Sequence, residues 1–151
     1  MSAAAQPPVL PVTFRPTVTR IVLLTTGAAL VVALTAIALL LENLSPGEQA
    51  SFIITGLLFL AALALFSRPK VVADEAGVTV VNLITTRRLE WAEVLRVNLR
   101  PGDAWVYLDL ADGTSLPAMG IQVGVAKARA IDDARTLRAL AERHGTGGGR
   151  S

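Results

Sequence analysis

Two long uncharged segments constrain the fold of this chain more than any other feature. The first, residues 21–41, lies between Arg20 and Glu42 and would form about 31 Å of helix. The second is uncharged over residues 49–67 and apolar over residues 52–66 except at Thr55. These lengths suit the hydrocarbon core of a bilayer, which is about 30 Å thick. The sequence therefore predicts transmembrane helices at 21–41 and 52–67, joined by an external loop at 42–51.

Two other interpretations of these segments are weaker. A soluble core would have to bury both helices, but only 17% of the 151 residues are charged and 52% are hydrophobic. The first segment could also be a secretory signal peptide, because Arg15 and Arg20 precede it. Its apolar run is longer than the usual 7 to about 15 residues, and no small-residue cleavage site follows it. We expect both helices to stay in the protein.

The positions of the cations predict the orientation. The loop between the helices contains Glu42 and Glu48 but no lysine or arginine. The cations lie in the N-terminal arm, residues 1–20, and after the second helix, where the positive-inside rule places them in the cytoplasm. We expect a multi-pass protein of a bacterial cell membrane, with both termini and the C-terminal half cytoplasmic.

The helices themselves favour an anchor over a transporter. Neither contains an ionisable residue, whereas pumps and proton relays usually need such groups inside the membrane. Thr25, Ala29 and Ala33 recur on one face of the first helix, and Gly56 lies in the second. Small residues of this kind predict close packing between the two helices.

Beyond Pro69 the sequence changes to short β-branched runs separated by turn residues. Such runs predict an antiparallel meander of six strands, at 71–73, 78–84, 87–91, 94–100, 104–110 and 114–118. Residues 124–144 have the periodicity of an amphipathic helix that ends at Gly145. We expect a domain at 69–144 and a disordered tail at 145–151.

Two hairpins of this meander have a predictable register. A type II turn at Arg100–Asp103, with Gly102 at its third position, would pair Arg96 with Tyr107 and Asn98 with Trp105. The opposite face, which includes Leu95, would then be apolar. For the next hairpin, a three-residue loop with a left-handed Gly113 keeps Leu108 opposite Leu116 and is preferred to a two-residue turn.

A twisted sheet with one apolar face, closed by one helix, is the architecture of a pleckstrin-homology (PH)-like barrel. The sequence resembles the bacterial PH domain of the low-molecular-weight protein antigen type, found in actinobacterial membrane proteins. The motifs that carry the resemblance are ADEAGV at 73–78, RRLEWAEV at 87–94 and LDLADGTSLP at 108–117. The resemblance implies seven strands, with the seventh near Lys70 or within 120–124, and it implies no reaction. The expected fold is a two-helix transmembrane hairpin followed by a small β-rich PH-like barrel with a C-terminal helix.

Few residues qualify as a binding site. Arg96, Trp105 and Tyr107 form the candidate partner surface, because aromatic residues beside arginine are enriched at protein interfaces. The alternative is that other strands, the helices or the N-terminal arm cover these side chains. Trp91 follows Leu89 at strand spacing and is expected in the core. The candidate contacts with the membrane surface are the cations that follow the helices, namely Arg68, Lys70, Arg87 and Arg88. The alternative for Arg87 and Arg88 is a role as solubilising charges.

Phosphoinositide binding of the PH type is not expected. Such domains hold phosphate with basic residues at the first β-hairpin loop, which the six-strand pattern places at 74–77. Asp74 and Glu75 in that loop would repel a phosphorylated headgroup. The formal net charge of +2 also gives little reason to expect a nucleic-acid partner.

The residues needed for catalysis are missing from the sequence. It has no cysteine and one histidine, His144, and it shows no phosphate-binding loop, no nucleophile motif and no metal-ligand spacing. We expect no enzyme, no cofactor and no metal site. The sequence instead favours a membrane-anchored PH-like module that binds or organises an unknown protein partner. The alternative is an accessory subunit of a transport or envelope-synthesis complex that acts through its helices.

Overall fold

A computed structural model of the chain describes residues 9–124 and 126–146, and it divides the chain into two compact units. One unit is residues 17–68, and the other is formed by the segments before and after it. Residues 1–8 of the expected arm and 147–151 of the expected disordered tail lie outside the described residues.

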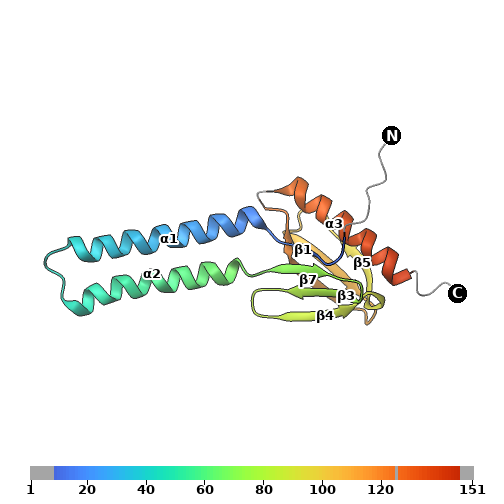
Figure 1. Cartoon of the computed structure of the whole chain (residues 1–151), viewed down its shortest axis with the longest axis horizontal. Coiled ribbons are helices and arrows are strands. Elements are labelled where there is room, and N and C mark those ends of the chain that lie inside the picture. Colours follow the sequence, from blue (N-terminus) through green and yellow to red (C-terminus); the bar gives the residue numbers. More distant parts are fainter. Residues whose placement is uncertain (1–8, 125, 147–151) are drawn as a thin grey trace. The chain divides into compact units, whose positions relative to one another are not determined.

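The first unit is a hairpin of two helices, α1 (Thr17–Leu40) and α2 (Pro46–Phe66) (Figure 1). Both are long and apolar enough to cross a membrane. A capping box starts α2: Ser45 Oγ accepts a hydrogen bond from the Glu48 N–H at 3.3 Å, and Glu48 accepts one from the Ser45 N–H at 2.8 Å. The sequence placed these helices correctly but began the second one several residues too late.

Glycines let the two helices pack closely. A Cβ on Gly27 would lie 2.8 Å from Leu60 Cδ1, and one on Gly56 would lie 3.2 Å from the Val31 Cα. The prediction for Gly56 is confirmed. The predicted face of Thr25, Ala29 and Ala33 is wrong for this contact, because all three side chains are exposed. Glycine has no Cβ, so Gly27 allows a closer approach than alanine or threonine would.

The second unit contains two antiparallel sheets and one helix. The first sheet has the order β1 (Val12–Phe14), β2 (Lys70–Ala73), β3 (Gly77–Val81) and β4 (Thr86–Glu90). After a 3₁₀ turn (Trp91–Glu93), the second sheet has the order β5 (Val94–Asn98), β6 (Trp105–Leu110) and β7 (Ser115–Gln122). The chain then forms α3 (Lys127–Ala141) and a π-helical turn (Glu142–Thr146). The expected sheet-plus-helix architecture is confirmed, but hydrogen bonding does not close the strands into one barrel.

The seventh strand comes from the N-terminal arm. In β1, Val12 pairs with Ala73 and Phe14 pairs with Val71 of β2. The two places proposed for it from the sequence belong to other strands, because Lys70 begins β2 and residues 120–122 extend β7. The helical hairpin is therefore an insertion between two neighbouring strands.

Both sheets and α3 contribute to one hydrophobic core. Its largest fully buried side chains include Leu89, Leu108, Ile121 and Leu137. Trp91 is only 4% exposed, as predicted, and its indole N–H donates to the Asp74 carbonyl at 2.8 Å. The Trp91 ring also stacks on His144 in the final turn, with ring centroids 5.4 Å apart. The π-helical turn after α3 therefore packs on the hydrophobic core through His144.

The two predicted hairpins differ in outcome. The β6–β7 loop is as predicted, with Gly113 at φ +87° and Leu108 opposite Leu116. The predicted β5–β6 register is wrong by two residues, because Arg96 faces Asp109 and Asn98 faces Tyr107 in the structure. The type II turn itself is present, with Gly102 at φ +92°. After it, the Ala104 carbonyl accepts the Val123 N–H at 3.0 Å, so Ala104 bonds toward β7 and not toward β5.

A bulge explains the other error in this hairpin. The register shifts between Val94 and Arg96, so the bulge falls at Leu95. Leu95 was expected on the apolar face, but its side chain is 67% exposed. An extra residue in one strand reverses the alternation of its side chains, which a strict two-residue period cannot anticipate.

The β3–β4 turn also lies elsewhere than predicted. The sequence pattern placed the strand up to Ile84 and the link at Thr85–Thr86, but the Asn82 N–H donates to the Thr85 carbonyl at 2.8 Å. The turn residues are therefore Leu83 and Ile84. The Asn82 side chain, 5% exposed, donates to the Pro117 carbonyl at 2.8 Å and accepts the Met119 N–H at 3.0 Å. This amide links the two sheets and fixes where β3 ends.

Candidate functional site

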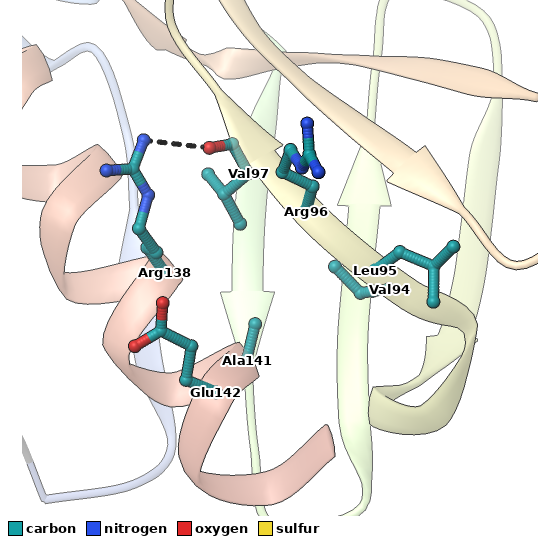
Figure 2. A pocket seen from close by; sticks show the side chains of 7 residues that line it. All are labelled: Val94, Leu95, Arg96, Val97, Arg138, Ala141 and Glu142. Carbon is teal, nitrogen blue, oxygen red and sulfur yellow. Dashed lines mark hydrogen bonds between the residues drawn. The ribbon is translucent and has the colours of Figure 1, made fainter. Parts of the chain in front are cut away.

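A groove of about 180 Å³ runs between β5 and α3 (Figure 2). Residues 94–97 line it on the strand side, and Arg138, Ala141 and Glu142 line it on the helix side. The Arg138 guanidinium donates to the Val97 carbonyl at 2.9 Å. This carbonyl therefore faces α3 and not β6, as expected for a strand at the edge of a sheet.

The groove lies at the edge of a sheet. β5 is the edge strand of its sheet, and α3 covers this edge at Val97, whose carbonyl binds Arg138. Figure 2 shows the exposed Leu95 side chain directed away from α3, beside Arg96. Within the described part of the chain, no group of three acidic, histidine or cysteine side chains could hold a metal ion.

The candidate partner surface is only partly assembled. Arg96 and Tyr107 lie on the face of the β5–β6 ladder that points away from the core, but the register separates them. Asp109 faces Arg96 and accepts hydrogen bonds from Asn98 Nδ2 and, at 2.9 Å, from Ser115 Oγ. Tyr107 lies between Asn98 and Pro117 and is half-buried.

Trp105 stands apart from this pair. It faces Gln122 of β7, and the register with β7 shifts directly after it because residues 119–121 of β7 are extra. Its indole nitrogen is buried and has no hydrogen-bond partner among the described residues. The exposed part of the surface is therefore Arg96 with its neighbours on β5.

The four cations that follow the helices have different environments. The Arg68 side chain is exposed, and Lys70 begins β2 and faces Val81. Arg87 Nη2 lies 3.9 Å from an oxygen of Asp112, in the β6–β7 loop. Arg88 reaches the other way, toward the β2–β3 turn, where both of its terminal nitrogens bind Asp74, at 2.6 and 2.8 Å.

The β2–β3 turn is tightly bonded to itself. Asp74 Oδ1 accepts the N–H groups of Ala76 and Gly77, each at 2.9 Å. The hydrogen bonds from Arg88 favour the charged carboxylate and lower the pKa of Asp74 to about 2. Arg88 also donates to Thr79 Oγ1 at 2.9 Å, so this arginine is held within the domain.

The position of this turn corrects one premise about phosphate binding. The sequence pattern made residues 74–77 the first hairpin loop, but β1 precedes β2 and the first connection is the helical hairpin. The turn joins the second strand to the third and lies at the far end of β2 from Lys70. Its carboxylates therefore give no information about the end of the sheet where the helices attach.

Three residues with structural or surface roles were missed from the sequence: Asn82, Ile84 and Leu95. Asn82 gave no signal, because its partners are 35 and 37 positions away. Ile84 and Leu95 looked like strand residues because a turn and a bulge without glycine resemble continuing strand.

Residues 68–140 match the family model described as a bacterial PH domain. This segment is therefore similar to the bacterial PH domain family. The match begins after α2, so the PH segment recognised from sequence extends from β2 into α3 and leaves out β1. The resemblance inferred from the three motifs is confirmed.

The chain is also similar to three mycobacterial proteins. Proteins from two strains of Mycobacterium tuberculosis and from Mycobacterium bovis, each named as uncharacterized, are 37% identical to it over 97 residues. This alignment covers 64% of the chain and 62% of each relative. No solved structure matches the chain.

Proposed function

We propose that this protein is a non-catalytic, membrane-anchored PH module that holds a protein partner at the cytoplasmic face of a bacterial membrane. In this proposal α1 and α2 span the bilayer as an anchor. The observation that carries it is the insertion of these two helices between β1 and β2, which pair with each other.

This insertion makes a same-side topology necessary if the helices span. β1 ends at Phe14, just before α1, and β2 begins at Lys70, just after α2. Two strands that pair must lie on the same side of a membrane, so the hairpin must cross it and return. The cation-free loop between the helices then lies outside, and the PH domain faces the cytoplasm.

The exposed side of β5 supports a protein partner. Leu95 offers apolar area and Arg96 a cation, and both lie on an edge strand beside the groove against α3. A protein segment that contacts the exposed side chains of β5 would bury Leu95 and place an acidic group at Arg96.

The test is cross-linking in cells followed by affinity purification in mild detergent. We expect a partner to cross-link to the wild type but not to the double variant Arg96→Glu/Tyr107→Ala. Arg135→Glu is the matched control, because Arg135 is an exposed cation on α3. Loss of the partner in both variants, or in neither, would contradict a recognition surface on β5 and β6.

A second candidate function uses the helices. The face of Thr25, Ala29 and Ala33 is left uncovered by α2, so it is available to helices of another membrane protein. In this case the chain would be an accessory subunit of a transport or envelope-synthesis complex. Exchange of residues 17–66 for an unrelated helical hairpin separates the two functions: retained partner binding favours the PH domain, and lost binding favours the helices.

A further inference from the structure

The β3–β4 turn has a composition that its folding role does not explain. Its two residues are Leu83 and Ile84, whereas two-residue hairpin turns favour asparagine, aspartate and glycine. Among the described residues, only glycines have positive φ, so the turn does not use the usual left-handed geometry either. The Ile84 side chain is 80% exposed. The Leu83 side chain is half-buried, so the exposed apolar area of the turn is mainly that of Ile84. A turn that departs from local rules is a candidate for function.

The register places this turn at the end of the sheet where the helices attach. Lys70, the first residue of β2, pairs with Val81, the last residue of β3. Phe14, the last residue of β1, pairs with Val71 at the same end. Three chain steps from Phe14 to Thr17 span at most about 11 Å, and four steps from Phe66 to Lys70 span at most about 14 Å. These two short connections are the covalent links between this end of the sheet and the helices.

The two ends of this sheet also differ in charge. At the helix-attached end, Lys70 lies beside the last residue of β3, and Arg87 follows the first residue of β4. Asp112 is near Arg87, but the 3.9 Å separation leaves that pair weak and exposed. At the other end, Arg88 is committed to Asp74 by two hydrogen bonds. The apolar tip is therefore flanked by cations, a combination that suits an anionic membrane surface.

We propose that Leu83 and Ile84 enter the headgroup–acyl boundary of the bilayer that α1 and α2 span, with Lys70 and Arg87 on its anionic lipids. This inference rests on the proposed membrane anchoring. The bilayer is chosen over a protein partner because the two short connections hold this sheet end near the helix ends. Contact at the tip would add a third point of attachment to the two chain connections and so limit the tilt of the PH domain.

The experiment uses the full chain, whose lack of cysteine allows single-site labelling. Ile84→Cys carries an environment-sensitive fluorophore in vesicles of phosphatidylcholine, with and without phosphatidylglycerol, and with a nitroxide-bearing lipid as quencher. Glu75→Cys in the β2–β3 turn is the matched control at the opposite end of the sheet. Leu58→Cys is the reference within the membrane, since Leu58 is 65% exposed on α2.

We expect the label at position 84 to shift its emission to the blue and to lose intensity with nitroxide lipid, as at position 58, while the label at 75 does neither. Phosphatidylglycerol should increase the quenching at 84, and Lys70→Gln/Arg87→Gln should remove that increase. Arg135→Gln should leave the increase unchanged.

The possible failures are distinguishable. Quenching at 58 but not at 84 would overturn the tip contact and leave the anchor intact. No quenching at 58 would contradict the proposed anchor itself. Equal quenching at 84 and 75 would mean that the domain lies flat on the lipid, which also overturns a contact made by the tip.

Discussion

The two turns at opposite ends of the β2–β3–β4 sheet are built in opposite ways. The β2–β3 turn is polar. Its Asp74 carboxylate accepts hydrogen bonds from two backbone N–H groups of the turn and from Arg88 of the same domain. The β3–β4 turn is apolar at Leu83 and Ile84, and Ile84 faces solvent. The first turn is thus explained by folding alone, whereas the second leaves exposed apolar area at the end where the helices attach.

This difference predicts how each turn responds to substitution. A turn that is closed by internal bonds and close packing should lose stability when a contact is removed or an atom is added. A turn whose outermost side chain, Ile84, is exposed to solvent should tolerate substitution of that side chain without loss of stability. Four variants test this contrast, and thermal unfolding can follow the PH domain selectively because both tryptophans of the chain, Trp91 and Trp105, lie in it.

The largest effect is expected at Gly77, where the polar turn joins β3. A Cβ at this position would lie 2.0 Å from the Leu89 carbonyl oxygen, and backbone atoms cannot move aside cheaply. We expect Gly77→Ala to lower the free energy of unfolding by about 3 kcal/mol. The measurement is thermal unfolding of the full chain in detergent, followed by tryptophan fluorescence.

Gly124→Ala is the matched control for this substitution, because nothing lies within 4 Å of its added Cβ. A change of less than about 0.5 kcal/mol is expected there. If Gly77→Ala were equally mild, the close approach of β3 and β4 at this turn would be wrong.

The next effect is expected at Asn82, directly before the apolar turn. Asn82→Ala removes the side chain that bonds the Pro117 carbonyl and the Met119 N–H, and it leaves both groups of β7 without that partner. We expect a loss of about 2 kcal/mol. Hydrogen exchange at the Met119 amide should speed up more than exchange elsewhere in β7.

Thr85→Ala controls for a change in the same turn, because the Thr85 side chain is exposed. It should change stability by less than about 0.5 kcal/mol. Equal losses in Asn82→Ala and Thr85→Ala would show that the turn as a whole, and not the amide between the sheets, sets the stability.

These elements also show how far the sequence could predict the fold. The two helices, Gly102, Gly113 and the buried face of α3 were found because each depends on a local signal: length, positive φ or a period of 3.6 residues. The motifs at 73–78, 87–94 and 108–117 were enough to recognise the PH segment. Local patterns were therefore reliable for the elements and for the family.

What the sequence could not show depends on contacts between distant segments. β1 is a three-residue strand whose partner lies beyond both helices, so nothing near Val12 marks it as a strand. The β5–β6 register was missed because Ala104 bonds Val123 of another segment. The same error affected the candidate partner surface. The observed register pairs Arg96 with Asp109, two residues from the predicted partner Tyr107.

A smaller effect, visible only in acid, is expected from Asp74. Its pKa is lowered from 3.8 to about 2 in the folded chain, so its interactions stabilise the fold above about pH 4 and are lost as the pH falls through 2. Asp74→Asn keeps an oxygen for Ala76 and Gly77 but removes the charge that Arg88 binds. The unfolding temperature of the variant should therefore fall less steeply than that of the wild type over this window.

The pair is solvent-exposed, so added salt should weaken the difference between wild type and Asp74→Asn. Identical acid profiles at low salt would mean that Arg88 contributes nothing to the turn. Arg88 would then again be a candidate for the membrane surface.

The smallest effect on folding is expected at Ile84, and its smallness is informative. Because the Ile84 side chain is 80% exposed, Ile84→Asn should change the free energy of unfolding in detergent by less than about 0.5 kcal/mol. Asparagine also suits a two-residue turn better than isoleucine does. A loss of about 2 kcal/mol would instead mean that Ile84 is packed within the folded chain, and its exposure would need another explanation. With stability unchanged, any loss of lipid contact in the same variant can be assigned to the tip itself, because the domain that carries it is still folded.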